Sequence, residues 1–239
     1  MKYHPIHSAN PITLLGGGEA NEADLHAALA IAPLCVGADG GGDLARRAGV
    51  HLEAIVGDFD SVSSETLESV APQRRLHVRE QDSTDFDKAL RHISAPVVVG
   101  VGFLGRRLDH QLAALHVLAV HADRPCVLLG QNEIAVLCPS QLQVDTVEGD
   151  VVSLFPLRAV AGTSIGLRWE IDGLAFDPMS LIGTSNVAVG ALSITMNAPG
   201  MILMLPRRYL AQVVRALASA SQSARWPVPA AQCIGRTQS

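Results

Sequence analysis

The chain has 239 residues, of which 48% are hydrophobic, so it is long enough and apolar enough to bury the core of one large domain or two modest ones. Its net charge of −5 offers no broad basic surface to a nucleic-acid backbone, so we expect no nucleic-acid partner. No uninterrupted apolar run approaches the ~18 residues of a membrane-spanning helix and the start lacks the layout of a signal peptide, so we expect a cytoplasmic protein with no membrane contact.

The first part of the chain alternates short apolar runs with helical patterns. Strands are predicted at 12–16, 34–39, 53–58, 96–102 and 126–130, and helices at 22–32, 43–49, 64–70, 85–93 and 109–122. This alternation predicts an α/β domain over residues 1–138, with a largely parallel sheet covered on both faces. In such sheets the ligand lies at the carboxyl ends of the strands.

The pattern changes after Leu137. Short strands separated by glycine, proline and asparagine turns predict an all-β sandwich domain over residues 139–210. The last part, 211–239, is predicted to be a helical extension followed by a mobile tail. Its helix should bury one face made of Leu210, Val213, Val214 and Leu217.

Two acidic motifs lie in the predicted α/β part of the chain, the first of them at the end of a predicted strand. "VGDFDSV" carries Asp58 and Asp60, and "QDSTDFDKAL" carries Asp82, Asp85 and Asp87. Like charges at this density need a cation, and Mg²⁺ takes carboxylate oxygens together with waters and substrate phosphates. The alternative is that these short motifs only form turns and helix caps. The two motifs together with "RRLDH" at another strand end favour a metal and phosphate site.

Lysine is almost absent from this chain, which has 18 basic residues but only Lys2 and Lys88 as lysines. Lys88 lies inside the second acidic motif, where a compact point charge differs from a planar guanidinium. The usual nucleotide signatures are missing, since Asn21 occupies the third glycine position of a dinucleotide fingerprint and no Walker-type loop exists. Phosphates would therefore bind through metal, Lys88, an arginine and glycine-loop amides.

The order of the motifs "ADGGGDLARRAG", "VGDFDSV", "QDSTDFDKAL", "GFLGRRLDHQLAAL", "GLRWEI" and "GTSN" resembles the thiamine pyrophosphokinase family. The resemblance implies an α/β domain for ATP followed by a β-sandwich, assembled as a homodimer. It implies transfer of the terminal diphosphate of ATP to the hydroxyl of thiamine, with release of AMP and a requirement for Mg²⁺. Positioning and charge neutralisation would supply most of the acceleration of such a transfer.

The resemblance also assigns roles to residues. Catalytic roles fall to Asp58, Asp60, Asp85 and Lys88, and the three aspartates among them are the expected metal ligands. ATP contacts are implied for Asp39, Gln81, Asp82, Thr84, Arg107 and Asp109, and thiamine contacts for Trp169, Ser185 and Asn186. The acceptor site is expected at the interface of two subunits, with Trp169 as its aromatic wall.

The chain departs from the family pattern at Asp43, Arg106, Ala114 and Val187, which bear on nucleotide and acceptor recognition. Arg106 and Arg107 are adjacent and should diverge, so only one of them is expected to reach the site. Two other functions stay open: a pyrophosphokinase for another hydroxymethyl heterocycle such as a pterin, and a non-catalytic nucleotide-binding regulator.

Overall fold

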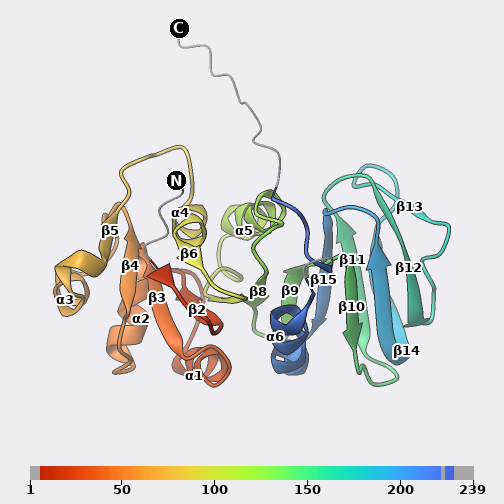
Figure 1. Cartoon of the computed structure of the whole chain (residues 1–239), viewed down its shortest axis with the longest axis horizontal. Helices are drawn as coiled ribbons and strands as arrows, with labels where there is room; N and C mark the ends of the chain where they lie inside the picture. Colours follow the sequence, from red (N-terminus) through yellow and green to blue (C-terminus); the bar gives the residue numbers. More distant parts are fainter. Residues whose placement is uncertain (1–5, 222–223, 229–239) are drawn as a thin grey trace, which may run out of the picture.

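A large mixed β-sheet runs along the whole molecule in the computed structural model, which describes residues 6–221 and 224–228 (Figure 1). The strand order along the sheet is β13-β12-β14-β11-β15-β9-β8-β7-β2-β3-β4-β5, with β10 paired to β14 off this path. The α/β class predicted from the sequence is therefore confirmed.

Six neighbouring strands at one end of the sheet pair in parallel. In spatial order they are β5 (Arg75–His77), β4 (Ala54–Gly57), β3 (Leu34–Ala38), β2 (Ile12–Leu15), β7 (Val98–Val101) and β8 (Cys126–Leu129). Every residue of β2, β4, β7 and β8 is buried, as expected for strands covered on both faces. Two further short strands, β1 (Ile6–His7) and β6 (Ile93–Ser94), pair with each other.

Helices cover both faces of this parallel part. These are α1 (Glu22–Leu29), α2 (Gly42–Arg47), α3 (Ser64–Ser69), α4 (Asp85–Arg91) and α5 (Leu108–Val120), with 3₁₀ turns η1 (Asp39–Gly41) and η2 (Pro72–Arg74) between them. Buried residues of α1 and α2 belong to one apolar cluster, and those of α4 and α5 to another. Figure 1 shows α4 and α5 above the strands and α1 below them.

The rest of the sheet is antiparallel. Its strands are β9 (Glu133–Leu137), β10 (Gln141–Val144), β11 (Val151–Pro156), β12 (Val160–Leu167), β13 (Ala175–Phe176), β14 (Gly183–Met196) and β15 (Met201–Pro206). The long strand β14 pairs with β11 in its first part and with β10 and β12 in its second. Strand β14 thereby links β11 to β10 and β12.

The hydrogen bonding does not stop at the predicted boundary near Pro139. Strand β9 pairs with β8 on one side and with β15 on the other, and β15 then pairs with β11. Residues 201–206, expected in a separate sandwich, therefore continue the sheet of the α/β part. The division at 138/139 stays a prediction, and the sheet itself crosses it.

The predicted helical face after residue 209 is confirmed. A 3₁₀ turn η3 (Arg207–Tyr209) leads into α6 (Leu210–Ser219), whose buried residues are Leu210, Val213, Val214 and Leu217. The expected mobile tail lies largely outside the described residues. Its described part reaches the core, because the Trp226 indole Nε1 donates a hydrogen bond of 2.9 Å to the Cys138 carbonyl. Within the described ranges, no helix combines the length and apolar character needed to cross a membrane.

Candidate active site

A cavity of about 480 Å³ lies at the carboxyl ends of the parallel strands. Its lining comes from the loops after β2, β3, β4 and β7, from the start of α4 and from the first turns of α5. The lining residues are Gly16–Gly18, Ala38–Gly40, Asp58, Asp60, Ser61, Gln81, Ser83–Phe86, Lys88, Gly102, Phe103, Gly105–Arg107, His110, Ala113 and Ala114. This is the edge at which the sequence places the acidic motifs.

Two glycine turns build one wall of this cavity. The Gly18 amide donates a hydrogen bond of 2.9 Å to the Gly102 carbonyl, joining the loop after β2 to the loop after β7. A Cβ on Gly18 would lie 2.4 Å from that same oxygen, so the close approach requires glycine. The loop at Gly16–Gly18 was expected to offer amides to phosphates, and it does line the cavity.

Three carboxylates meet in the cavity. Asp39, Asp58 and Asp60 each present an oxygen, and these oxygens lie within 4.8 Å of one another. Asp39 Oδ1 and Asp58 Oδ1 are buried without a hydrogen-bond partner among the described residues. A buried carboxylate oxygen without a donor is costly unless a cation or solvent satisfies it, so this donor set fits a hard divalent cation.

The backbone at this cluster is held in an unusual conformation. Asp39 has φ of 44° and Phe59 has φ of 65°, both in the left-handed region that residues other than glycine rarely adopt. Phe59 separates Asp58 from Asp60, and its ring stacks on His77 with centroids 5.1 Å apart. Conformations of this kind persist where the surrounding structure fixes them, and they cluster at functional sites.

Asp39 is the most buried member of the cluster. Its Oδ2 accepts a hydrogen bond of 2.6 Å from the Ser61 hydroxyl, which leaves Oδ1 for the cavity. Burial, together with the nearby Asp60 and Asp85 carboxylates, raises the pKa of Asp39 above its usual range. A bound cation would reverse this effect by favouring the ionised form.

Lys88 lies between two carboxylates. Its side chain is 3% exposed, and Nζ is 3.0 Å from Asp58 Oδ2 and 3.1 Å from Asp85 Oδ1. Burial alone would lower the pKa of Lys88, but its hydrogen bonds to Asp58 and Asp85 raise it above the usual value. The Lys88 hydrogen bond in turn lowers the pKa of Asp58. The lysine is therefore charged, and it connects α4 to the loop after β4.

The second acidic motif contributes only part of its residues. Gln81 Nε2 donates a 3.1 Å hydrogen bond to Asp58 Oδ2. Thr84 lines the cavity and also caps α4, since its hydroxyl accepts from the Asp87 amide at 3.2 Å. Asp85 pairs with Lys88 and is not in the group formed by Asp39, Asp58 and Asp60. Asp82 is exposed and is not among the lining residues.

Both arginines of "GRRLDH" line the cavity, contrary to the expectation that only one would. The Arg107 guanidinium donates two hydrogen bonds to the Asp109 carboxylate, of 3.1 Å from Nε and 2.6 Å from Nη2. These bonds raise the pKa of Arg107 and lower that of Asp109. Asp109 itself is not a lining residue. The two side chains reach the cavity together because Arg106 lies in a turn with φ of 59° and not in a regular element.

The three residues expected at the acceptor lie elsewhere. Trp169 follows β12, while Ser185 and Asn186 lie in β14, and none of them lines the cavity. Asn186 is buried and fixes the tryptophan backbone, because its Nδ2 donates to Trp169 O at 2.7 Å and its Oδ1 accepts from Trp169 N at 3.2 Å. Ser185 has φ of 62° and its amide donates to Ser153 Oγ at 3.0 Å.

Trp169 is not a core residue. Its side chain is 58% exposed, and the Arg168 guanidinium lies 5.7 Å from the centre of its ring. Figure 1 places β12 and β14 at the opposite end of the molecule from β3 and β4. Within one subunit, Trp169 and the acidic cluster therefore belong to separate surfaces.

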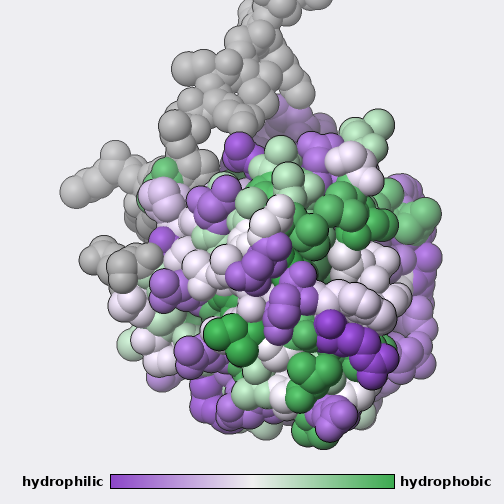
Figure 2. Space-filling view, turned by 90° about the vertical axis from the view of Figure 1, so that its right-hand side faces the viewer, coloured by the Kyte–Doolittle hydropathy of each residue, from purple (hydrophilic) through white to green (hydrophobic). Residues whose placement is uncertain are grey.

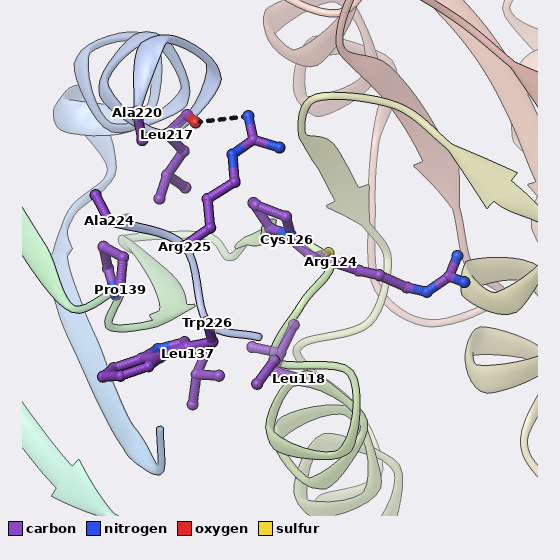
Figure 3. A pocket seen from close by; sticks show the side chains of 12 residues that line it. Leu118, Arg124, Cys126, Leu137, Pro139, Leu217, Ala220, Ala224, Arg225 and Trp226 are labelled. Atoms are coloured by element: carbon purple, nitrogen blue, oxygen red, sulfur yellow. Dashed lines mark hydrogen bonds between the residues drawn. The ribbon is translucent and has the colours of Figure 1, made fainter. Parts of the chain in front are cut away.

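A second cavity, of about 20 Å³, lies beneath the C-terminal segment (Figure 3). Figure 3 shows Trp226, Leu137, Leu118 and Leu217 around it, and Arg225 reaching toward the Leu217 carbonyl. About 20 Å³ is room for a single water molecule, so this cavity is too small for a substrate. The strand-end cavity is the candidate active site.

Sequence reasoning missed several residues of this site. Asp39 was assigned to the nucleotide and not to the metal group, and Ser61 and Ser83 were not considered. A signal for Asp39 existed, because it directly follows β3, and Asp58 directly follows the neighbouring strand β4. The signal for Ser61 was weaker, since serine after aspartate is common in turns.

Residues 25–128 match the sequence model of the family described as thiamin pyrophosphokinase, catalytic domain. The chain is thus similar to the catalytic domain of this family over somewhat less than half of its length. "Thiamine pyrophosphokinase 2" from Oryza sativa subsp. japonica is 29% identical over 170 residues, covering 63% of each chain. "Thiamine pyrophosphokinase 1" from Arabidopsis thaliana is 28% identical over 163 residues, covering 60% of this chain and 61% of the relative. The chain thus spans about three fifths of the length of these curated relatives.

Solved structures of thiamin pyrophosphokinases share the fold. The enzyme from Candida albicans superposes with a TM-score of 0.69 at 14% identity, covering 86% of this chain and 93% of that one. The enzyme from Geobacillus thermodenitrificans gives 0.66 at 24% identity, covering 82% and 96%. At these identities the likeness shows the fold alone. It extends over both the parallel and the antiparallel parts of the sheet.

Proposed function

We propose that the chain transfers the diphosphate of ATP to the hydroxyl of thiamine, giving thiamine diphosphate and AMP. The observation that carries this proposal is the strand-end cavity, where Asp39, Asp58 and Asp60 converge beside a buried Lys88. The similarity to thiamine pyrophosphokinases suggests the substrates, and the two buried carboxylate oxygens without a donor among the described residues are the reason for proposing a cation. The cavity of about 480 Å³ has room for a nucleotide's phosphates and part of its sugar.

Asp39, Asp58 and Asp60 would hold Mg²⁺ in this proposal. The bound ion would neutralise charge on the phosphate chain of ATP. Asp85 was predicted as a third ligand alongside Asp58 and Asp60. Its pairing with Lys88 favours a different task, which is to orient the acceptor hydroxyl and accept its proton.

Lys88 is held in place before any substrate arrives. Two carboxylates hold its ammonium, so little reorganisation is needed when phosphate charge develops nearby. Gln81 donates a hydrogen bond to Asp58 Oδ2, the same oxygen that Lys88 contacts. ATP contacts are further proposed for Thr84, Arg107 and the glycine loop, which line the cavity. They are also proposed for Asp82 and Asp109, which do not line it but are next to lining residues in the chain.

The acceptor site is proposed to be shared between two subunits of a homodimer. Trp169 is exposed and lies far from the acidic cluster of its own chain, so a partner subunit must bring such an aromatic wall to the cavity. The antiparallel end also exposes Ile165, Met179, Ile182 and Val189. Figure 2 faces this end and shows apolar side chains among polar ones, which is the surface a dimer contact would cover.

A single assay tests the reaction. Purified protein is incubated with ATP and Mg²⁺, and AMP release is measured with thiamine, with a pterin alcohol, or with neither. We expect AMP and thiamine diphosphate in equal amounts when thiamine is the added acceptor, and no AMP in the other two reactions. AMP release with the pterin alcohol and not with thiamine would show that the acceptor is a pterin alcohol. No AMP release with either would indicate a non-catalytic nucleotide-binding protein.

A further inference from the structure

Arg106 has a backbone conformation that an arginine rarely adopts. Its φ of 59° lies in the left-handed region, which glycine enters freely and a residue with a Cβ does not. It lies in the turn between β7 and α5, next to Gly105 and at the edge of the strand-end cavity. A strained residue in such a place points to a role for its side chain.

Arg106 is exposed and is one of the residues that line the cavity. No carboxylate of the described residues forms an ion pair with it. Its neighbour differs, since the Arg107 guanidinium already donates to both oxygens of Asp109. The hydrogen-bonding capacity of Arg107 toward a second anion is correspondingly smaller.

Lys88, the other lysine or arginine of the cavity wall, is also engaged. Its ammonium lies between Asp58 and Asp85, and its side chain is almost completely buried. Of the lysines and arginines that line the cavity, within the described ranges, only Arg106 has no carboxylate partner. A ligand that carries several negative charges therefore meets one cation whose charge is not yet neutralised.

We propose that Arg106 binds the phosphate chain of the nucleoside triphosphate. This inference rests on the proposed function, because it assumes that ATP occupies the strand-end cavity. A guanidinium suits the task, since its planar fork donates two parallel hydrogen bonds to phosphate oxygens. Arg107, paired to Asp109 at the start of α5, then makes the weaker of the two arginine contacts to ATP.

The test compares three substitutions at this position. Arg106→Gly removes the guanidinium and the backbone strain, Arg106→Ala removes the guanidinium alone, and Arg106→Lys keeps a positive charge without the fork. The dissociation constant for ATP with Mg²⁺ is measured by titration calorimetry, and thermal unfolding is followed in parallel. Arg46→Ala, on the exposed face of α2, is the matched control.

We expect Arg106→Gly and Arg106→Ala to raise the dissociation constant for ATP about tenfold or more, the effect of losing a charged hydrogen bond. Arg106→Lys should lie between them and the wild type, and Arg46→Ala should match the wild type. The midpoint of thermal unfolding of Arg106→Gly should be no lower than that of the wild type, which separates lost binding from lost folding. The affinity for thiamine should not change.

Unchanged ATP affinity in Arg106→Gly, with normal binding by the wild type, overturns this inference and leaves the proposed function standing. A loss of affinity in Arg106→Ala that Arg106→Gly does not share also overturns it, because the backbone and not the guanidinium would then be responsible. A wild-type chain that binds no ATP overturns the proposed function and this inference together.

Discussion

Asp58 and Asp60 lie two residues apart after β4, and the left-handed turn at Phe59 between them takes both carboxylates to the cavity. Asp39 reaches the same point from β3, with Ser61 holding one of its oxygens. The two buried oxygens left without a donor are what distinguish this cluster from an ordinary acidic turn. Its role in binding a cation is therefore testable at single residues.

Asp58→Asn and Asp60→Asn should each lower kcat at least about 100-fold, on the scale of losing one preorganised electrostatic contact. The amide keeps the shape of the side chain and removes its charge, so the midpoint of thermal unfolding should change little for the exposed Asp60. Turnover is measured over a range of Mg²⁺ concentrations. Near-normal activity of either variant at limiting Mg²⁺ would remove that residue from the metal site.

Substitutions of Lys88 are expected to affect both turnover and stability. Lys88→Ala should reduce turnover strongly and should also lower stability, because it leaves Asp58 and Asp85 without their shared cation. Lys88→Arg should fold yet recover little turnover, since a planar fork does not fit a space in which the lysine side chain is 3% exposed. Steady-state kinetics and urea unfolding separate the two effects. Full activity of Lys88→Arg would reduce Lys88 to a general positive charge.

At the scale of elements, helix α4 is held at both of its ends by side-chain hydrogen bonds. Its start carries Asp85 and Lys88, and Thr84 caps it. At its end, the Arg124 guanidinium Nη1 donates to the carbonyls of Leu90 at 2.9 Å and Ile93 at 2.7 Å. His121 Nε2 lies 2.5 Å from Asp87 Oδ1 and ties the same helix to the end of α5.

Arg124→Met should lower the free energy of unfolding by about 1–3 kcal/mol, since it leaves carbonyls at the end of α4 without their donor. The arginine is distant from the cavity lining, so the dissociation constant for ATP should stay near that of the wild type. Urea unfolding and calorimetry give the two quantities. Unchanged stability would show that solvent replaces the guanidinium without cost.

At the scale of the whole molecule, the long sheet separates two surfaces that one reaction would need. The strand-end cavity lies at the parallel end, and the exposed Trp169 follows β12 at the antiparallel end (Figure 1). In the proposed shared site, a second copy of the chain brings the two surfaces together. The exposed apolar residues of the antiparallel end are the surface that such an assembly would bury.

Mixed dimers test this arrangement. Trp169→Ala should raise the concentration of thiamine needed for half-maximal turnover, because an aromatic face near a desolvated cation contributes ~2 kcal/mol. It should leave ATP affinity and thermal stability nearly unchanged, since the side chain is 58% exposed. Asp58→Asn and Trp169→Ala subunits, mixed and allowed to exchange, should then regain one working site per mixed dimer. Proven exchange without recovered turnover would contradict the shared site.

The sequence by itself determined the parallel arrangement of strands and helices in the first part of the chain. Apolar runs such as 96–102 are too short for buried helices, and the amphipathic segments between them need a sheet to cover. It also placed Asp39, Asp58 and Asp60 at one edge of that sheet, because parallel strands end on the same side. The buried face of α6 followed from its spacing in the same way.

Only the tertiary structure decided what depends on contacts between distant segments. The pairing of β9 with β15 carries the sheet across the expected domain boundary, and no local pattern encodes which strand edge meets which. The choice of Asp39 over Asp85 in the carboxylate cluster depends on where Lys88 lies after folding. Among the described residues, Arg107 pairs with Asp109 while the adjacent Arg106 has no carboxylate partner. The sequence does not predict this difference, because side-chain pairing depends on positions in space.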